Sequence, residues 1–315
     1  MLESPPDFKG MRFLVVGGAG FIGSHIAERL LGLGGRVVVL DDMSNGRRSK
    51  LPSGNDSLEV IQGDVRNFPF DTLGEIDGVF NEAARALVPS FADPMTDLEV
   101  NAGGTARVLE YARLHDVKVV QASSGSVYGN PVRVPITEDH PLNPISPYGV
   151  SKLTSEYYCS MYRSDYGLDV VALRYFNVYG PRQTASEEMG VIPIFVKRAL
   201  RKEPLKIFGD GRQTRDFLNV RDVVDANILA YISKKSGGHV MNVGGGGKEV
   251  SIEQLARMVM NLCGFDAPLV YADPKPGDIR RLVADNTRAR ELIGYVPHVP
   301  LEVGLREYIE FARRA

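Results

Sequence analysis

The sequence predicts an α/β protein with a doubly wound parallel sheet, and two patterns carry this prediction. Over the first 175 residues, short apolar runs alternate with longer amphipathic segments. The runs are continuous and rich in β-branched residues, as expected of strands buried on both faces of a parallel sheet. Regular alternation of such strands with helices places helices on both faces of the sheet. The expected strands are 13–16, 37–40, 58–61, 78–80, 117–121 and 170–173, and the expected helices are 22–33, 96–114 and 147–166.

The character of the chain changes after Arg182. Loops rich in proline, glycine and charged residues then separate shorter expected helices at 192–201, 222–233 and 252–263. We therefore expect residues 11–180 to form the sheet domain. Residues 181–315 are expected to form a smaller region, interleaved with that domain and packed against it.

Composition narrows the class of protein. The 315 residues are 43% hydrophobic and 24% charged, which is ordinary for a globular protein, and the formal net charge is -2. This charge gives no reason to expect a nucleic-acid or anionic-membrane partner. The two cysteines and five scattered histidines predict neither a disulfide scaffold nor a metal site. No apolar run approaches the ~20 residues of a membrane span, so we expect a cytoplasmic protein.

A glycine-rich motif, GGAGFIG at residues 17–23, directly follows the first expected strand and opens the first expected helix. A glycine string alone is weak evidence, but this strand–glycine–helix context is typical of dinucleotide binding. Glycines let the backbone approach a pyrophosphate, and the helix N-terminus offers free N–H groups and the positive end of its dipole. The sequence therefore predicts a Rossmann-type site around Gly17, Gly20, Phe21, Ile22 and Gly23.

Two acids, Asp41 and Asp42, end the second expected strand, and Asp41 lies 18 residues after the last glycine of the motif. An acid here accepts hydrogen bonds from the adenosine ribose hydroxyls and repels a 2′-phosphate, which favours NAD over NADP. The basic residues Arg47, Arg48 and Lys50 follow closely and could hold such a phosphate. Such a basic run is more often a solvated loop. NAD is therefore the expected cofactor, and NADP is the alternative.

Further motifs follow in a fixed order along the chain: DDMSNG at 41–46, GDVRN at 63–67, EAARA at 82–86, NAGGT at 101–105, SSGSVYG at 123–129, YGVSK at 148–152, LRYFNVYGPRQ at 173–183, GVIP at 190–193, FGDGRQTRDF at 208–217 and PGD at 276–278. In this order they resemble the extended short-chain dehydrogenases/reductases of the NAD-dependent sugar epimerase/dehydratase family. The resemblance covers about residues 11–301.

The resemblance implies a bound NAD. Asp64 and Val65 would lie by the adenine, and the residues after the fourth strand by the nicotinamide half. Asn81 stands where the family often has histidine, and Lys275 where it often has arginine. The cofactor-binding residues that the resemblance implies are Gly17, Gly20, Phe21, Ile22, Gly23, Asp41, Asp42, Asn45, Gly46, Asp64, Val65, Ala83, Ala84, Asn101, Tyr148, Lys152 and Phe176.

Tyr148 and Lys152 lie four residues apart on one face of the expected helix 147–166, where Ser146 is a good N-cap and Pro147 suits the first helical position. Such a pair alone is most often part of a solvated helix face. In the family that the chain resembles, however, the pair is catalytic. A free phenol titrates near pH 10. A nearby ammonium is expected to lower the pKa of the phenol, so that it can accept a proton from a sugar hydroxyl. The resemblance implies that Ser124 holds the same hydroxyl and relays its proton.

The resemblance also implies a substrate region within residues 181–315. Asn177 and Arg215 match the residues that meet the diphosphate of a nucleotide sugar, and the planar fork of arginine suits phosphate. Phe208 would pack near the nucleobase, although an isolated phenylalanine is as often a core residue. Arg182 is either a phosphate ligand or part of a structural ion pair. The substrate-binding residues implied are Ser124, Asn177, Val191, Phe208, Arg215 and Asp278.

The residues after Ser124 point to the reaction. The family's dehydratases normally carry Asp-Glu there, and its decarboxylases usually carry a glutamate at the second position, whereas this chain has Gly125 and Ser126. What remains suits reversible oxidation at one carbon, which predicts a UDP-hexose 4-epimerase. The alternatives are a nucleotide-sugar dehydrogenase or reductase with net redox chemistry, and a non-catalytic NAD-binding sensor. Leu282, at a position that often limits the C2 substituent of the sugar, is intermediate in size and does not decide which sugar is bound.

Assembly as a homodimer is a further expectation. In this family the helices expected at 96–114 and 147–166 pair across a two-fold axis as a four-helix bundle. The second of them carries Leu153, Tyr157, Met161 and Tyr162, which are too many large side chains for one buried face.

Overall fold

The computed structural model describes residues 6–184, 190–274 and 279–314. Its centre is a seven-stranded parallel sheet with the strand order β11-β6-β5-β4-β1-β2-β3. This arrangement confirms the predicted doubly wound sheet. The strands are β1 (Arg12–Val16), β2 (Arg36–Asp41), β3 (Leu58–Gln62), β4 (Gly78–Asn81), β5 (Lys118–Ser124), β6 (Val170–Tyr175) and β11 (Val240–Val243).

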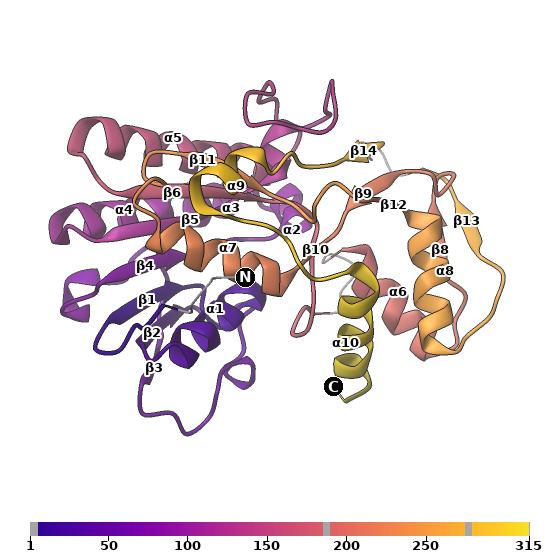
Figure 1. The fold of residues 1–315 in the computed structure, drawn as a ribbon, viewed down its shortest axis with the longest axis horizontal. Helices are drawn as coiled ribbons and strands as arrows, with labels where there is room; N and C mark the ends of the chain where they lie inside the picture. Colours follow the sequence, from indigo (N-terminus) through magenta and orange to yellow (C-terminus); the bar gives the residue numbers. More distant parts are fainter. Residues whose placement is uncertain (1–5, 185–189, 275–278, 315) are drawn as a thin grey trace.

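Helices cover both faces of this sheet (Figure 1). One face carries α4 (Gly104–His115) and α5 (Pro147–Tyr166), and the other carries α1 (Phe21–Gly32), α7 (Val220–Ile232) and α9 (Thr287–Ile293). Consecutive β1 residues belong to opposite cores, because Val15 packs with the α1 side and Leu14 with the α4 side. Both side chains are fully buried, which explains why the strand sequence is continuously apolar.

A second, smaller lobe lies on the right of Figure 1. Its core is formed by α6 (Val191–Leu200), α8 (Ile252–Cys263) and α10 (Leu301–Arg314). Three small sheets have the orders β12-β9-β14, β13-β8 and β10-β7. Their strands are β7 (Val178–Tyr179), β8 (Lys206–Phe208), β9 (Thr214–Asp216), β10 (Leu218–Asn219), β12 (Glu249–Ser251), β13 (Val270–Ala272) and β14 (Arg281–Leu282). The chain leaves this lobe to contribute α7, β11 and α9 to the sheet layers.

The single helix expected at 96–114 is instead α3 (Pro94–Leu98), a π-helical turn (Glu99–Gly103) and α4, preceded by α2 (Leu87–Ala92). At the π turn, the carbonyl oxygen of Asn101 accepts hydrogen bonds from the hydroxyls of Thr105 (2.6 Å) and Ser155 (2.9 Å). These side-chain donors compete with the regular helical pattern, which explains the local widening. Single 3₁₀ turns lie at Arg48–Lys50, Phe70–Leu73 and Gly125–Tyr128.

Helix α5 begins and ends where the sequence predicted. The Ser146 hydroxyl accepts a hydrogen bond from the Gly149 N–H (3.0 Å), and Pro147 occupies the first turn. Gly167 ends the helix in the left-handed conformation, with φ of 72°. The helix thus presents its first turns, with Tyr148 and Lys152, toward the carboxyl ends of the sheet strands.

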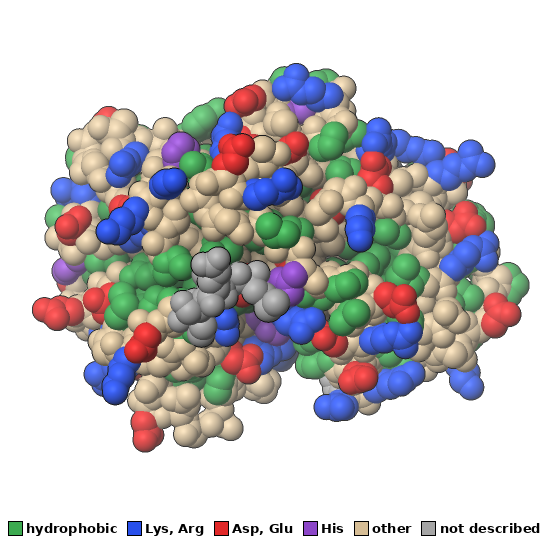
Figure 2. Space-filling view, viewed as in Figure 1, with side chains coloured by type: hydrophobic (Ala, Val, Ile, Leu, Met, Phe, Trp, Pro, Cys, Tyr) green, Lys and Arg blue, Asp and Glu red, His purple; other side chains and the backbone are tan. Residues whose placement is uncertain are grey.

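The surface has mixed charge. On the face drawn in Figure 2, lysine and arginine side chains are interspersed with acidic side chains over both lobes. Within the described ranges, no helix has the length and apolar character needed to cross a membrane.

Candidate active site

A pocket of about 600 Å³ opens at the carboxyl ends of β1 to β4. The strand order reverses between β1 and β4, and open α/β sheets bind ligands at such a switch point. Most of the predicted cofactor-binding residues line this pocket: Gly17, Gly20, Phe21, Ile22, Gly23, Asp41, Asp42, Asn45, Gly46, Asp64, Val65, Ala83, Ala84 and Tyr148.

The glycine loop forms a narrow cradle at the start of α1. Gly17 has a φ of +73°, and a Cβ atom there would lie 2.7 Å from the Ala83 backbone nitrogen. Gly20 is the N-cap of α1 and has no side-chain capping bond. The first-turn N–H groups can therefore bind an anion, and the residues present fit the pyrophosphate of a dinucleotide.

Asp41 is held rigidly at the end of β2. Its carboxylate accepts hydrogen bonds from the N–H groups of Ala19 and Met43, each at 2.9 Å. Burial raises the pKa of this group, and its remaining lone pairs are available to ribose hydroxyls. Lys50 also lines the pocket, whereas Arg47 and Arg48 are not part of its wall within the described chain.

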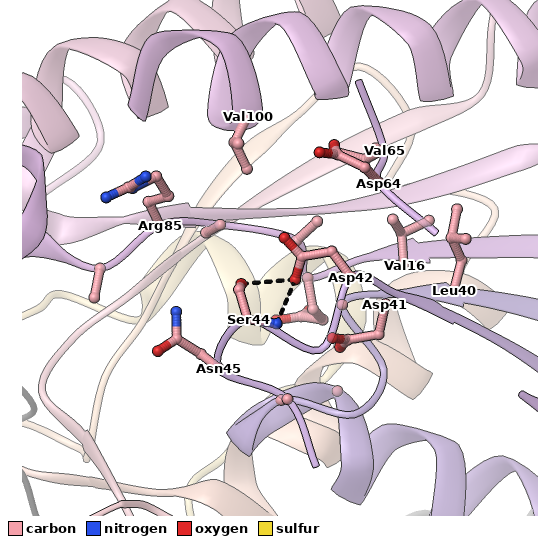
Figure 3. A pocket seen from close by; sticks show the side chains of 18 of the residues that line it. Val16, Leu40, Asp41, Asp42, Ser44, Asn45, Asp64, Val65, Arg85 and Val100 are labelled. Atoms are coloured by element: carbon pink, nitrogen blue, oxygen red, sulfur yellow. Dashed lines mark hydrogen bonds between the residues drawn. The ribbon is translucent and has the colours of Figure 1, made fainter. Parts of the chain in front are cut away.

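Two further acids border the pocket from neighbouring loops (Figure 3). Asp42, after β2, accepts hydrogen bonds from the backbone N–H (2.9 Å) and hydroxyl (2.6 Å) of Ser44. Asp64, after β3, is paired with Arg66 (2.6 Å), and hydrogen bonding to that guanidinium lowers the pKa of the carboxyl group. These contacts set the shape of the pocket wall beside Val65.

The three predicted catalytic residues come together at the end of β5. The side chains of Ser124 and Tyr148 interact, although 24 residues separate them in the chain, and Ser124 Oγ donates a hydrogen bond to Ser126 Oγ (3.1 Å). Lys152 is only 1% exposed, and its Nζ donates a hydrogen bond to the Ala122 carbonyl (3.0 Å). The same Nζ lies 5.9 Å from the centre of the Tyr148 ring. The structure thus assembles a phenol, a hydroxyl and an ammonium group in one place.

Burial has the largest effect on the pKa values of Tyr148 and Lys152. It raises the pKa of Tyr148 to about 12, and the negative charges of Asp97 and Glu82 add to the effect. Burial lowers the pKa of Lys152 to about 8, while Glu82 and Asp97 oppose that change. We expected the Lys152 ammonium to lower the pKa of the phenol. The structure differs, because burial and the two carboxylates raise the pKa of Tyr148.

Two predicted cofactor-binding residues lie behind the pocket wall. Asn101 is fully buried; its side-chain oxygen accepts a hydrogen bond from the Arg85 N–H (2.8 Å), and its nitrogen donates to Ser151 (2.9 Å). It therefore ties the loop after β4 to α5. Phe176 is 1% exposed, and a Cβ atom at Gly125 would lie 3.1 Å from its ring.

Asn177 is the predicted substrate residue with the clearest unfilled hydrogen-bonding capacity. It lies after β6 with a φ of 44°, which is unusual for a residue with a side chain. Its buried amide nitrogen has no hydrogen-bond partner among the described residues. An unpaired buried donor is costly, so this nitrogen is suited to an acceptor on a ligand.

Three other predicted substrate residues, Val191, Phe208 and Arg215, belong to the smaller lobe. Val191 begins α6, and Phe208 ends β8, where Lys206 lies 4.9 Å from the centre of its ring. Arg215, in β9, donates hydrogen bonds to backbone carbonyls, including that of Ile279 (2.7 Å). Asp278 lies outside the described residues. Arg182 is paired with Glu28 of α1, which supports its structural role.

Sequence-based prediction missed three charged residues that line the pocket: Arg66 after β3, and Glu82 and Arg85 after β4. The Arg85 guanidinium lies 3.4 Å from the Asp93 carboxylate. Glu82 and Arg85 lie in the segment that follows β4, at the edge of the sheet where ligands bind. That position alone was a reason to consider them, but only the structure shows that their side chains line the cavity.

Comparisons with known proteins agree with this geometry. Residues 13–244 match the model of the NAD dependent epimerase/dehydratase family. A UDP-glucose 4-epimerase of Mycolicibacterium smegmatis is 44% identical over 311 residues, which cover 96% of this chain and 99% of that protein. The structure of a Thermotoga maritima UDP-glucose 4-epimerase with UDP-glucose is 38% identical, with a TM-score of 0.90 and coverage of 96% and 99% of the two chains. That of the Thermus thermophilus UDP-glucose 4-epimerase with NAD is 37% identical, with a TM-score of 0.87 and coverage of 97% and 100%.

The chain therefore belongs to the NAD-dependent epimerase/dehydratase family.

Proposed function

We propose that this protein is an NAD-dependent nucleotide-sugar 4-epimerase whose substrate is a UDP-hexose. The observation that carries the proposal is the Ser124–Tyr148–Lys152 group beside a pocket that fits a dinucleotide. The residues after Ser124 are Gly125 and Ser126, so this position supplies no carboxyl group for loss of water or carbon dioxide. The similarity to UDP-glucose 4-epimerases over nearly the whole chain supports the same activity.

Each residue then has a distinct part in the reaction. When bound, NAD supplies the hydride acceptor and donor for C4 of the sugar, and its oxidised ring adds a positive charge. Tyr148 accepts the proton of the C4 hydroxyl and later returns it, while Ser124 hydrogen-bonds the same oxygen. Lys152 stabilises the phenolate that forms. Asn177 and Arg215 hold the diphosphate in this proposal, so that the sugar can turn over without leaving.

The first prediction concerns the mass of the product. Purified protein incubated with UDP-glucose or UDP-galactose is expected to form the C4 epimer, with unchanged mass and no accumulation of free NADH. Mass spectrometry, chromatographic separation of the epimers and absorbance at the NADH band measure these outcomes. Stoichiometric NADH would instead establish the dehydrogenase alternative.

A product lighter by water, or by carbon dioxide when the substrate is a UDP-sugar acid, would show that another residue supplies the missing acid. That result would exclude a simple epimerase. Absence of turnover for every UDP-sugar, with NAD still bound, would favour a non-catalytic sensor.

The protein is also proposed to be a cytoplasmic homodimer. Helices α2, α3 and α5 pack against one another, and each exposes large apolar side chains. Of the four α5 residues considered from the sequence, Leu153 and Tyr162 are buried within the subunit, whereas Tyr157 is 62% exposed. The exposed large apolar side chains on these elements are Leu87, Val88, Phe91, Met95, Leu98, Val150, Tyr157, Tyr158 and Tyr166.

Light scattering at micromolar concentration tests the dimer. We expect twice the chain mass for the wild type and a monomer for Phe91→Asp combined with Tyr157→Asp, because two charges would then be buried without partners. The matched control is Val303→Asp on α10, an exposed site in the smaller lobe. A monomeric wild type would refute the proposal.

A further inference from the structure

Glu82 is a carboxyl group in the cofactor pocket for which the proposed reaction has no use. It directly follows β4 and lines the cavity together with Tyr148. The hydroxyl of Tyr175, the last residue of β6, donates a hydrogen bond to Glu82 Oε1 (2.8 Å). The amide of Asn227, on α7, in turn donates to the Tyr175 oxygen (2.8 Å). Glu82 is therefore held by a defined network from the α7 side of the sheet.

The sheet register brings this carboxyl group close to the catalytic pair. Asn81 of β4 is opposite Gln121 of β5, so the next residue, Glu82, lies beside Ala122. The Ala122 carbonyl accepts the hydrogen bond from Lys152 Nζ at 3.0 Å. The register thus brings Glu82, after β4, and the Lys152 ammonium of α5 to neighbouring positions on β5, and their charges interact.

We propose that Glu82 is a positioning residue that acts through Lys152: its carboxylate keeps Lys152 in the ammonium form and thereby sets the pH range of the reaction. This inference rests on the proposed function. Without an adjacent negative charge, a lysine that is 1% exposed loses its proton more readily. The same carboxylate disfavours the phenolate of Tyr148, so both groups depend on its charge.

The titratable groups around Glu82 and Lys152 come from three elements. Burial raises the pKa of Glu82 to about 7, whereas the Tyr175 hydrogen bond and the Lys152 charge lower it. The charges of Asp97, Glu156 and the Cys159 thiolate also favour the ammonium form of Lys152. The groups to be considered are Tyr148, Lys152, Glu156 and Cys159 of α5, Asp97 of α3 and Tyr175 of β6.

The pH dependence of the free energy of unfolding tests the interaction between the Glu82 and Lys152 charges and does not require an activity assay. A carboxyl group with a raised pKa in the folded chain stabilises the fold below its unfolded value and loses that contribution as pH rises through the folded value. For Glu82 this window runs from 4.5 to about 7. Lys152 has a lowered pKa, so its charge destabilises the fold, and stability recovers above about pH 8.

The test uses Glu82→Gln, which keeps an acceptor for Tyr175 and removes the charge. Urea unfolding is measured from pH 4.5 to 10. We expect the free energy of unfolding of the variant not to fall between pH 4.5 and 7, as it does in the wild type. Its rise at alkaline pH is expected to begin about one pH unit lower than in the wild type. The matched variant, Tyr175→Phe, keeps the carboxylate but loses the donor, so its acid-side loss is expected to extend to higher pH.

The pH profile of kcat/KM is measured on the same proteins. We expect both limbs of the Glu82→Gln profile to move toward acid by about one pH unit, because the Lys152 and Tyr148 pKa values both fall. A merely structural role would lower the plateau without moving the limbs. Unmoved limbs, or an unshifted alkaline recovery of stability, would overturn the proposal. A wild type that epimerises no UDP-sugar would refute the proposed function, while the unfolding data would still decide the coupling.

Discussion

Tyr148→Phe is expected to lower turnover by about 10²–10⁴-fold, the range for loss of a positioned acid–base group. The phenol interacts with the Ser124 side chain and lines the pocket, so its oxygen lies where the C4 hydroxyl of the sugar is expected. Phenylalanine keeps the ring and therefore the packing of the first turn of α5. The measurement is the rate of UDP-galactose conversion, together with NAD affinity by calorimetry and the thermal midpoint.

The matched control is Tyr166→Phe, which loses the same oxygen at the far end of the same helix, where the side chain is 55% exposed. It is expected to convert substrate at the wild-type rate. Turnover within a few-fold of wild type in Tyr148→Phe would remove this residue as the proton acceptor. Loss of NAD binding in that variant would assign it to cofactor binding instead.

Lys152→Met is expected to have the second largest effect, a loss of about 10–10³-fold in kcat/KM. An adjacent opposite charge shifts a pKa by about 1–3 units, and that stabilisation of the phenolate disappears with the ammonium. Methionine fills similar space in a site that is 1% exposed, so the fold is expected to persist. Steady-state kinetics and calorimetric NAD binding are measured side by side, and a weaker NAD affinity is expected as well.

Lys118→Met is the control for burial of a lysine. Lys118 begins β5, at the opposite end of the strand that ends in Ser124, and its Nζ donates to the Ser233 carbonyl (2.6 Å). Burial lowers the pKa of this lysine as well. We expect lower stability but unchanged turnover per folded molecule. Equal losses of turnover in both variants would mean that Lys152 acts only through stability.

Much of the sheet and its principal helices could be predicted from consecutive residues. The strand runs are continuously apolar because both faces of the sheet are covered. The pattern of apolar residues along the chain therefore indicates which segments are buried strands and which are helices. The limits of α5 follow from Ser146, Pro147 and Gly167, whose effects on a helix end are local. The glycine loop could be recognised because its tight turn and the start of the following helix both depend on the seven residues 17–23.

The π turn and β11 depended on distant parts of the chain. The π turn arises where hydroxyls, including that of Ser155 on another helix, bind the Asn101 carbonyl. Strand β11 is four residues long, includes the buried Asn242, and gains its place by pairing with β6. A run of four residues has no distinctive periodicity, so this segment forms a strand because it pairs with β6.

The sequence by itself determined the class of site: the dinucleotide loop, the acid after β2, and the tyrosine and lysine on one helix face. Only the tertiary structure decided the charge environment. Glu82 and Tyr175 are 93 residues apart in sequence, and their hydrogen bond exists only because β4 and β6 end at the same edge of the sheet. Spacing along a helix is a local property, whereas burial and the approach of charged groups depend on how distant segments pack, and these set the pKa values of Tyr148 and Lys152.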